Sequence, residues 1–309
     1  MSVRVLYVGG CGRSGSTLLD RLLGQVPDVV AIGEVVHIWR RGVAEDQLCG
    51  CGKAFTDCPF WSAVGAQAFG GWAAFDVEEA MALQRRVDRN RYIPLMLAPR
   101  LSSRYRRDLA RYLALLDKLY TAIGAVSGAS VVVDSTKHAS YAFLLRRVPS
   151  IDLRVAHLVR DSRGVAFSWT KEVRKPEVVD AEAYMPRYHP VRMGARWLAY
   201  NGLFHLLRRA GVPTAFVRYE PLIAEPRTEL RRILAFAESH AHDLPFVDEG
   251  AVVLEPTHSV AGNPMRFSNG RIALRIDEQW RTSMPPAQRA VVSTITWPLM
   301  RHYGYRVRG

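Results

Sequence analysis

The chain has 309 residues, 49% of them hydrophobic, and can therefore enclose one large core or two smaller ones. No segment approaches the roughly 18 apolar residues that a membrane-spanning helix needs, which excludes a transmembrane helix. The net charge of +13 comes almost wholly from arginine, because only five of the 42 basic residues are lysine. Such a balance suits an anionic ligand, a nucleic acid or a membrane surface, and does not choose between them.

The first predicted unit is a strand, a tight loop and a helix. Residues 3–8 are β-branched and aromatic, residues 9–15 contain four glycines, and residues 18–23 carry leucines at helical spacing. Successive backbone N–H groups in such a loop converge on an anion, and the helix dipole adds to the attraction. Because the first strand starts at residue 3, we expect no signal peptide and a cytoplasmic protein.

The loop departs from the nucleotide-binding pattern G-x-x-x-x-G-K-[ST] at one position. Gly10, Gly15 and Thr17 match the pattern, but Ser16 stands where the lysine that clamps the γ-phosphate belongs. Arg13 instead brings a forked cation that can make two hydrogen bonds to one phosphate or sulfate group. A P-loop kinase or NTPase is the alternative interpretation, although this sequence lacks the lysine and offers no convincing carboxylate for magnesium.

Residues 13–17, Arg-Ser-Gly-Ser-Thr, resemble the 5′-phosphosulfate loop of sulfotransferases that use 3′-phosphoadenosine 5′-phosphosulfate (PAPS), which runs [KR]-S-G-[ST]-[ST]. The resemblance implies a three-layer α/β sandwich with a central, mainly parallel sheet and a P-loop-like phosphosulfate-binding loop. It implies PAPS as co-substrate and PAP as product. It assigns these loop residues to the cofactor: Gly12, Arg13, Ser14, Gly15, Ser16 and Thr17.

A second short strand, residues 27–32, ends at Gly33 and Glu34. Ligands of doubly wound folds gather at the carboxyl ends of strands. Glu34 therefore either faces the glycine-rich loop at residues 9–15, the phosphate loop, or is an ordinary surface glutamate. It lies 21 residues after Arg13, the interval found between the loop arginine and the catalytic glutamate in tyrosylprotein-type and some bacterial sulfotransferases. The resemblance therefore implies that Glu34 is the general base.

The next region, about residues 35–75, is predicted to be irregular and to cover or shape a site. It contains Cys49, Cys51 and Cys58, a spacing that is one ligand short of a tetrahedral zinc site, with His37 as the nearby candidate for the fourth. We favour instead a loop stabilised by small buried thiols or by one local disulfide, and we predict no metal site.

From about residue 76 to residue 125 the pattern becomes helical and rich in arginine. Together with the irregular region it forms a predicted insertion at about 35–125 within one domain of residues 1–309. The basic patch at residues 100–111 is either a solvated helix face or a peripheral membrane contact.

Two further apolar strands, residues 130–134 and 153–159, are predicted to form buried parallel sheet. The second strand delivers Arg160, followed by a helix that carries Ser168. This second unit of strand, basic turn and helix predicts a second anion site. Two such sites in one sheet need a ligand that is anionic at both ends.

Residues 159–169 resemble the segment of sulfotransferases in which an arginine and a serine eight residues later hold the 3′-phosphate. Arg160 and Ser168 keep that interval. Some relatives place a further arginine twelve residues after the first, where this chain has Glu172. The proline-rich and aromatic residues 174–190 are predicted to form an acceptor-binding lid.

A helix is predicted at residues 191–209 and a last strand at residues 212–217. The turn after it resembles the family's Y-E-x-L turn, which implies that Tyr219 lies beside the adenine. A late basic loop of sulfotransferases closes over the 3′-phosphate and ribose, and Asn263 and Arg266 occupy a similar place.

Sulfuryl transfer requires an in-line arrangement, charge stabilisation on the leaving phosphate and a base for the acceptor. Arg13 and the loop amides suit the developing negative charge. Glu34 is the predicted base, and His138 is the alternative because the cytosolic type uses a histidine. Lys137 either acts as the acid toward the leaving group or forms a salt bridge with Asp134.

The sequence thus predicts a PAPS-dependent sulfotransferase that acts on a hydroxyl or amine of a small-molecule, lipid or carbohydrate acceptor. Neither the acceptor nor the oligomeric state can be read from it. A nucleic-acid-binding module would alternate arginines and aromatics on one face, whereas the informative arginines here follow single strands. We therefore expect no nucleic-acid partner.

Overall fold

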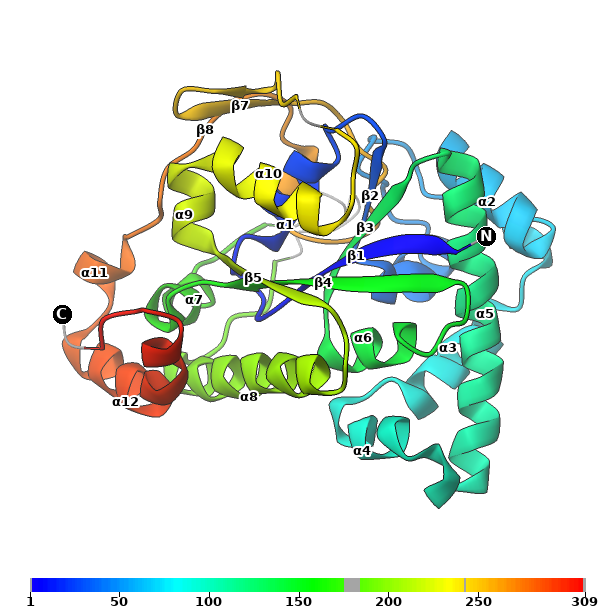
Figure 1. Cartoon of the computed structure of the whole chain (residues 1–309), viewed down its shortest axis with the longest axis horizontal. Helices are drawn as coiled ribbons and strands as arrows, with labels where there is room; N and C mark the ends of the chain where they lie inside the picture. Colours follow the sequence, from blue (N-terminus) through cyan, green and yellow to red (C-terminus); the bar gives the residue numbers. More distant parts are fainter. Residues whose placement is uncertain (1, 175–183, 242, 308–309) are drawn as a thin grey trace.

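The computed structural model describes residues 2–174, 184–241 and 243–307 of the chain. Its centre is a parallel sheet with the strand order β2-β3-β1-β4-β5, covered by helices on both faces (Figure 1). This arrangement confirms the predicted three-layer α/β fold. The five strands are β1 (Val3–Gly9), β2 (Val29–Gly33), β3 (Val131–Lys137), β4 (Ile151–Val159) and β5 (Thr214–Arg218).

The two faces of the sheet enclose two hydrophobic cores, and successive residues of β1 enter them alternately. Val5 and Tyr7 pack into one core, and Leu6 and Val8 pack into the other. Because helices cover both faces, the central strands are apolar throughout. The first core is covered by α5 (Ser103–Ser127), α6 (Ala139–Leu145) and α8 (Pro190–Arg209), and the second by α1 (Ser16–Leu23), α9 (Tyr219–Ala224) and α10 (Pro226–Phe236).

The region between β2 and β3 is mainly helical, so the prediction of an irregular segment at about 35–75 is wrong in this respect. Trp39, Phe55 and Trp61 are fully buried there, and the rings of Phe55 and Trp61 stack at 5.1 Å. Buried aromatic side chains therefore organise helices in a stretch whose glycines suggest a loop. Besides α5, the region contains a π-helical segment (Ile38–Ala44) and the helices α2 (Pro59–Phe69), α3 (Val77–Val87) and α4 (Ile93–Leu97). It also contains 3₁₀ turns at Val35–His37, Trp72–Ala74, Asn90–Tyr92 and Pro99–Leu101.

The last third of the chain adds elements that the sequence pattern did not predict. A small antiparallel sheet has the strand order β6-β7-β8 and lies beside the layer that contains α10 (Figure 1). A long C-terminal helix, α12, contains Pro298, which disguises its helical pattern. The elements of the last third are β6 (Val247–Asp248), β7 (Ala251–Leu254), β8 (Gly270–Ala273), α11 (Trp280–Ser283), α12 (Pro286–His302) and a 3₁₀ turn at Pro264–Phe267. Helix α7 (Ser162–Ser168) comes earlier in the chain, directly after β4.

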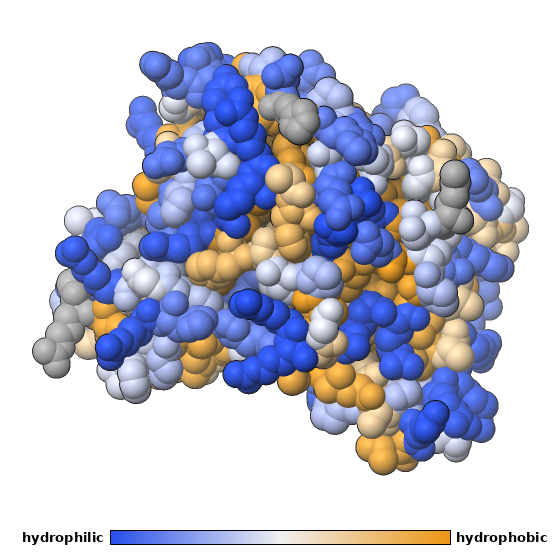
Figure 2. All heavy atoms as spheres, in the orientation of Figure 1, coloured by the Kyte–Doolittle hydropathy of each residue, from blue (hydrophilic) through white to orange (hydrophobic). Residues whose placement is uncertain are grey.

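The surface seen in Figure 2 is largely hydrophilic, with hydrophobic side chains exposed between the polar ones. Within the described ranges, no helix combines the length and the apolar character needed to cross a bilayer. Leu97, which precedes the basic patch, is 43% exposed, and Leu101 within the patch is 75% exposed. The peripheral membrane contact at residues 100–111 stays a prediction.

Gly10→Ala should destabilise the fold by about 2 kcal/mol or more. A Cβ at residue 10, where φ is 140°, would lie 2.2 Å from the carbonyl oxygen of Leu158 in β4, and this backbone is fixed by the sheet. Gly202→Ala in α8 is the control, because a Cβ there meets nothing within 4 Å and alanine favours the helix. Urea unfolding measures both variants, and a Gly10→Ala variant as stable as the wild type would contradict this contact.

Candidate active site

The carboxyl ends of the parallel strands open onto a cavity of about 590 Å³. Six cationic side chains and two carboxylates line this cavity, so it selects anionic ligands. The cations are Arg13, Arg41, Lys137, Arg160, Arg196 and Arg275, and the carboxylates are Glu34 and Asp277.

The loop between β1 and α1 forms one wall of the cavity. Arg13 and Gly15 have left-handed backbone conformations, with φ values of 71° and 95°. A Cβ at Gly15 would lie 2.7 Å from the ring of Tyr219, so glycine allows the loop to pack directly on this ring. Ser14 is buried and does not line the cavity, whereas the other predicted loop residues do: Gly12, Arg13, Gly15, Ser16 and Thr17.

The guanidinium of Arg13 is held by aromatic and thioether groups. It lies 5.1 Å from the centre of the Trp169 ring, and its Nη2 lies 3.2 Å from the Sδ atom of Met185. Its buried Nε has no hydrogen-bond partner among the residues that the structure describes. Burial lowers the pKa of Arg13, and Glu34 partly opposes this shift. The guanidinium is thus held in position with donor capacity left for an anion.

Arg160, at the end of β4, contacts the phosphate loop directly. Its Nη1 donates a hydrogen bond of 3.3 Å to the backbone oxygen of Arg13, and its guanidinium lies 4.5 Å from the Tyr219 ring. Its Nη2 contacts both the backbone oxygen of Asp277, at 2.8 Å, and the carboxylate, at 3.2 Å. The residues that were predicted to form the two anion sites therefore lie side by side in one cavity.

Asp277 balances the charge of this second site. Its carboxylate lies 3.1 Å from the Nζ atom of Lys171 as well as close to Arg160. Burial alone would raise the pKa of Asp277, but Lys171 and Arg160 hold it below its usual value. Sequence reasoning did not identify Asp277, because a single aspartate in a tail segment belongs to no motif.

Glu34 and Lys137 form a partly buried ion pair at the ends of β2 and β3. The Nζ atom of Lys137 lies 2.5 Å from Oε1 of Glu34 and also donates to the backbone oxygen of Ser135 at 3.1 Å. The Nε2 atom of His37 lies 3.6 Å from the other carboxylate oxygen. Burial raises the pKa of Glu34, but Lys137 and His37 outweigh it and hold this pKa below its usual value. Glu34 is therefore ionised at neutral pH.

The alternative prediction of a salt bridge between Lys137 and Asp134 is wrong, because the carboxylate of Asp134 has other partners. It accepts a hydrogen bond of 2.5 Å from the hydroxyl of Tyr120 and one of 2.8 Å from the backbone N–H of Thr136. Buried donors thus satisfy Asp134, and Lys137 extends toward Glu34 instead.

His138, the alternative base, also lines the cavity. Its ring centre lies 6.1 Å from that of His37 and 6.5 Å from that of Tyr200. Burial, together with the charge of Lys137, lowers the pKa of His138 to about 4. The imidazole is therefore neutral at neutral pH, and like Glu34 it is in the form that accepts a proton.

Arg266 lies behind the cavity wall instead of lining it. It is fully buried, and its Nη1 donates a hydrogen bond of 2.9 Å to the backbone oxygen of Ser259. A Cβ at Gly262 would lie 3.4 Å from Oε1 of Glu34 and 3.8 Å from Cδ of Arg266, so the loop backbone separates these two side chains. The remaining residues predicted to bind the cofactor line the cavity: Ser168, Tyr219 and Asn263.

The predicted acceptor lid is described only in part, since residues 175–183 lie outside the described residues. Met185, Pro186 and Tyr188 from this segment line the cavity. Helix α8 adds side chains that sequence reasoning missed, although their spacing of three and four places them on one helix face. They are Met193, Arg196 and Tyr200.

Comparison with known proteins agrees with this geometry. The model of the sulfotransferase family matches residues 6–243, and the chain belongs to this family. No curated protein matches the chain.

Two solved structures are similar over almost the whole chain. The sulfotransferase domain from the Synechococcus PCC 7002 olefin synthase has 17% identity and a TM-score of 0.50, covering 99% of this chain and 95% of that one. The sulfotransferase domain from the curacin biosynthetic pathway has 15% identity and a TM-score of 0.51, covering 99% of each chain. At such low identity the similarity establishes the fold alone.

Lys137→Met should destabilise the protein by about 3 kcal/mol at neutral pH, because Glu34 then stays buried without its main partner. In the wild type the pKa of Glu34 is lowered in the folded state, so this group stabilises the fold at pH values above the ordinary pKa of glutamate. That contribution is lost as the pH falls through the lowered pKa. In the variant, burial raises the pKa of Glu34, so protonation relieves the penalty as the pH falls. Urea unfolding should show the difference between the two proteins shrinking from about pH 7 to about pH 4.

Lys118→Met is the matched control, because Lys118 is exposed on α5. It should change the free energy of unfolding by less than about 0.5 kcal/mol at either pH. A Lys137→Met penalty that stays constant with pH would show that Lys137 does not stabilise the charge of Glu34.

Proposed function

We propose that this sulfotransferase transfers the sulfuryl group of PAPS to a hydroxyl or amine of its acceptor, with Glu34 as the general base. The observation that carries the proposal is the contact between Arg160 and the backbone oxygen of Arg13 at 3.3 Å. It joins the two anion sites in one cavity, as a ligand with phosphate-type groups at both ends requires. When bound, PAPS supplies an activated sulfuryl group.

The phosphate loop fits the 5′-phosphosulfate end of this donor. The unused Nε of Arg13 and the following helix dipole both favour an anion at the loop. We assign the 5′ end to the backbone of residues 12–17 and to Arg13, which stabilises negative charge on the leaving phosphate. Tyr219 lies between Gly15 and Arg160, where its ring can support the adenine.

The other end of the donor is assigned to Arg160 and Ser168. Arg160 is now paired with the carboxylate of Asp277, which occupies one anion position on this guanidinium. A phosphate that carries more charge competes with this carboxylate for the same donors. Asn263 lines the same cavity and is assigned to the nucleotide.

Glu34 accepts the proton of the acceptor, and Lys137 stabilises the leaving group. The ionised carboxylate of Glu34 takes the proton from the acceptor hydroxyl or amine as the new bond to sulfur forms. The bond between sulfur and the bridging oxygen of the 5′-phosphate breaks in the same step, and PAP leaves with the electron pair on that oxygen. Lys137, which is held at 2.5 Å from this carboxylate, donates a hydrogen bond to the bridging oxygen of the leaving group. The arginines of the cavity provide the positive charge that this step needs.

The acceptor side of the cavity has an apolar and aromatic character. Tyr200 lies beside His138, while Met185, Tyr188 and Met193 contribute further apolar surface. These side chains favour a small-molecule, lipid or carbohydrate acceptor with an apolar portion near its reactive group. The rival P-loop kinase lacks support, because Ser16 occupies the position of its phosphate-clamping lysine.

Arg160→Ala should weaken PAP binding about 30-fold, because it removes charge-assisted hydrogen bonds worth about 2 kcal/mol. Titration calorimetry with PAP and with ATP measures this loss. The wild type should bind PAP and not ATP. An unchanged PAP affinity in the variant would remove Arg160 from the donor site, and preferential ATP binding would favour the kinase.

Two variants serve as controls for this measurement. Asp277→Asn should tighten PAP binding several-fold, since it removes the carboxylate that competes for Arg160. Arg281→Ala should leave PAP binding unchanged, because Arg281 is half exposed and pairs with Glu278. Weaker PAP binding by Asp277→Asn would contradict the competition.

Glu34→Gln should lower kcat about 1,000-fold while PAP affinity changes by less than about threefold, because the loss is confined to proton transfer. The assay supplies PAPS to a panel of acceptors and detects the mass gain of one SO₃ group. His138→Asn should retain most of the activity. If Glu34→Gln stays active and His138→Asn is inactive, His138 is the base.

A further inference from the structure

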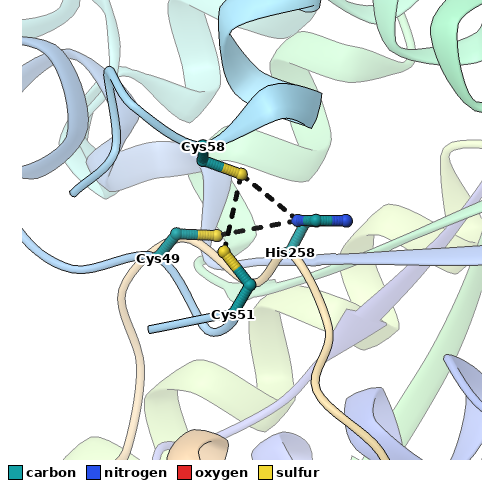
Figure 3. Close-up of side chains that lie close together, drawn as sticks. All are labelled: Cys49, Cys51, Cys58 and His258. Atoms are coloured by element: carbon teal, nitrogen blue, oxygen red, sulfur yellow. Dashed lines mark hydrogen bonds between the residues drawn. The ribbon is translucent and has the colours of Figure 1, made fainter. Parts of the chain in front are cut away.

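A second cluster of reactive side chains lies outside the cavity. The Sγ atoms of Cys49, Cys51 and Cys58 and the Nδ1 atom of His258 all lie within 4.8 Å of one another. Figure 3 shows the four side chains converging from three separate stretches of chain. Cys49 and Cys58 are fully buried, and Cys51 and His258 are partly buried.

The distances between these atoms suit one tetrahedral metal ion. Zinc–sulfur bonds of about 2.3 Å and zinc–nitrogen bonds of about 2.0 Å place tetrahedral ligands roughly 3.5 to 3.8 Å apart. The Sγ atoms of Cys51 and Cys58 are 3.7 Å apart, and Nδ1 of His258 lies 3.2 Å from Cys58 and 4.0 Å from Cys49. Of the two alternatives that the sequence left open, the local disulfide is not formed, since all four cysteines are free, whereas the thiols of Cys49 and Cys58 are buried.

The first two cysteines lie in a tight turn that is closed without a ligand. The backbone N–H of Cys49 donates to the oxygen of Lys53, and that of Gly52 donates to the oxygen of Cys49, both at 2.8 Å. Gly52 has a φ of 87°, which favours glycine, and Leu48 pairs with Ala54 across the turn. The turn is therefore preformed by backbone hydrogen bonds.

The other two ligands are also fixed by neighbouring groups. Cys58 is the residue that directly precedes α2. The ring of His258 stacks on that of Phe60 at 5.0 Å, and its backbone oxygen accepts a hydrogen bond of 2.8 Å from Nε1 of Trp61. The backbone N–H of Gly50 donates to the oxygen of Ser259 at 2.9 Å, which joins the turn to the histidine segment.

We propose that Cys49, Cys51, Cys58 and His258 bind one structural Zn²⁺ ion. Three thiolates and a neutral imidazole complete the tetrahedron and leave no position for water, as in closed structural sites. Binding releases the thiol protons to solvent and leaves the metal centre with one net negative charge. Sulfur-rich tetrahedral sites exclude magnesium and calcium, and four ligand atoms this close enclose a single ion.

This proposal departs from the prediction of no metal site, and it replaces His37 with His258 as the candidate fourth ligand. His37 contacts the carboxylate of Glu34 instead, at 3.6 Å. The histidine of the cluster lies 200 residues after Cys58, far beyond any local spacing pattern. No zinc motif written for one short segment would include it.

The metal joins the insertion to the edge of the sheet that carries Glu34. Two residues after His258, the N–H of Val260 donates to the oxygen of Ile32 at 2.9 Å, and its oxygen accepts from the N–H of Glu34 at 2.8 Å. Zinc thus fixes the segment that leads to Asn263 in the cavity wall. Its removal should loosen this edge and lower the melting temperature by more than about 5 °C.

Elemental analysis of the full-length protein, purified without chelator after growth with added zinc, tests the proposal. We expect about one zinc per chain in the wild type and less than about a tenth of that in Cys51→Ser and His258→Asn. The controls Cys11→Ser and His240→Asn should retain zinc, since Cys11 lies in the phosphate loop and His240 is exposed. Metal content is measured without donor or acceptor, so it does not depend on the proposed function.

Because the cluster variants can fail to fold, a second measurement uses the wild-type protein alone. Wild-type protein that has been stripped by a chelator and refilled with Co²⁺ should show thiolate charge-transfer and tetrahedral absorption bands. The proposal is overturned if reduced wild-type protein takes up neither metal, or if the cluster variants keep as much zinc as the controls. A disulfide between Cys51 and Cys58 in freshly purified protein, or iron in place of zinc, would also overturn it.

Discussion

The active site depends on the contact between two strand ends that the parallel sheet brings together. Arg160 follows β4 and donates to the backbone of Arg13 in the loop that follows the adjacent strand β1. The ring of Tyr219 packs against both Gly15 and Arg160, so the end of β5 completes the same wall. Because all carboxyl ends of a parallel sheet meet at one edge, cationic side chains accumulate there and an anionic ligand is favoured.

Two ion pairs in the cavity wall each fix a cationic side chain against a carboxylate. Glu34 fixes Lys137, and Asp277 fixes Arg160. These pairs keep long side chains in a single arrangement before any ligand is present, which reduces the entropy lost on binding. The two pairs differ in exposure, since Glu34 is 14% exposed and Asp277 is 33% exposed.

Local patterns were sufficient to predict the five parallel strands and the residues that directly follow them. These patterns placed Arg13, Glu34, Lys137 and Arg160 at the carboxyl ends of strands, and the structure places all four in the wall of one cavity. The roles of these residues stay proposals. Contacts between distant parts of the chain could not be predicted. Asp277 and the side chains of α8 reach the cavity only through tertiary packing, and Arg266 lies behind the loop backbone because Ser259 holds its guanidinium. Buried aromatic side chains overrode the glycine-rich pattern around residues 35–75.

The order in which these parts leave the ribosome follows from their places in the chain. The phosphate loop and the three cysteines are made first, whereas His258, Asn263 and Asp277 come after residue 243, where the match to the family ends. Until these late residues emerge, Arg160 lacks the carboxylate of Asp277, and the three thiols lack the imidazole of His258. The parallel sheet can therefore form early in translation, whereas the wall of the cavity is complete only when translation is nearly finished.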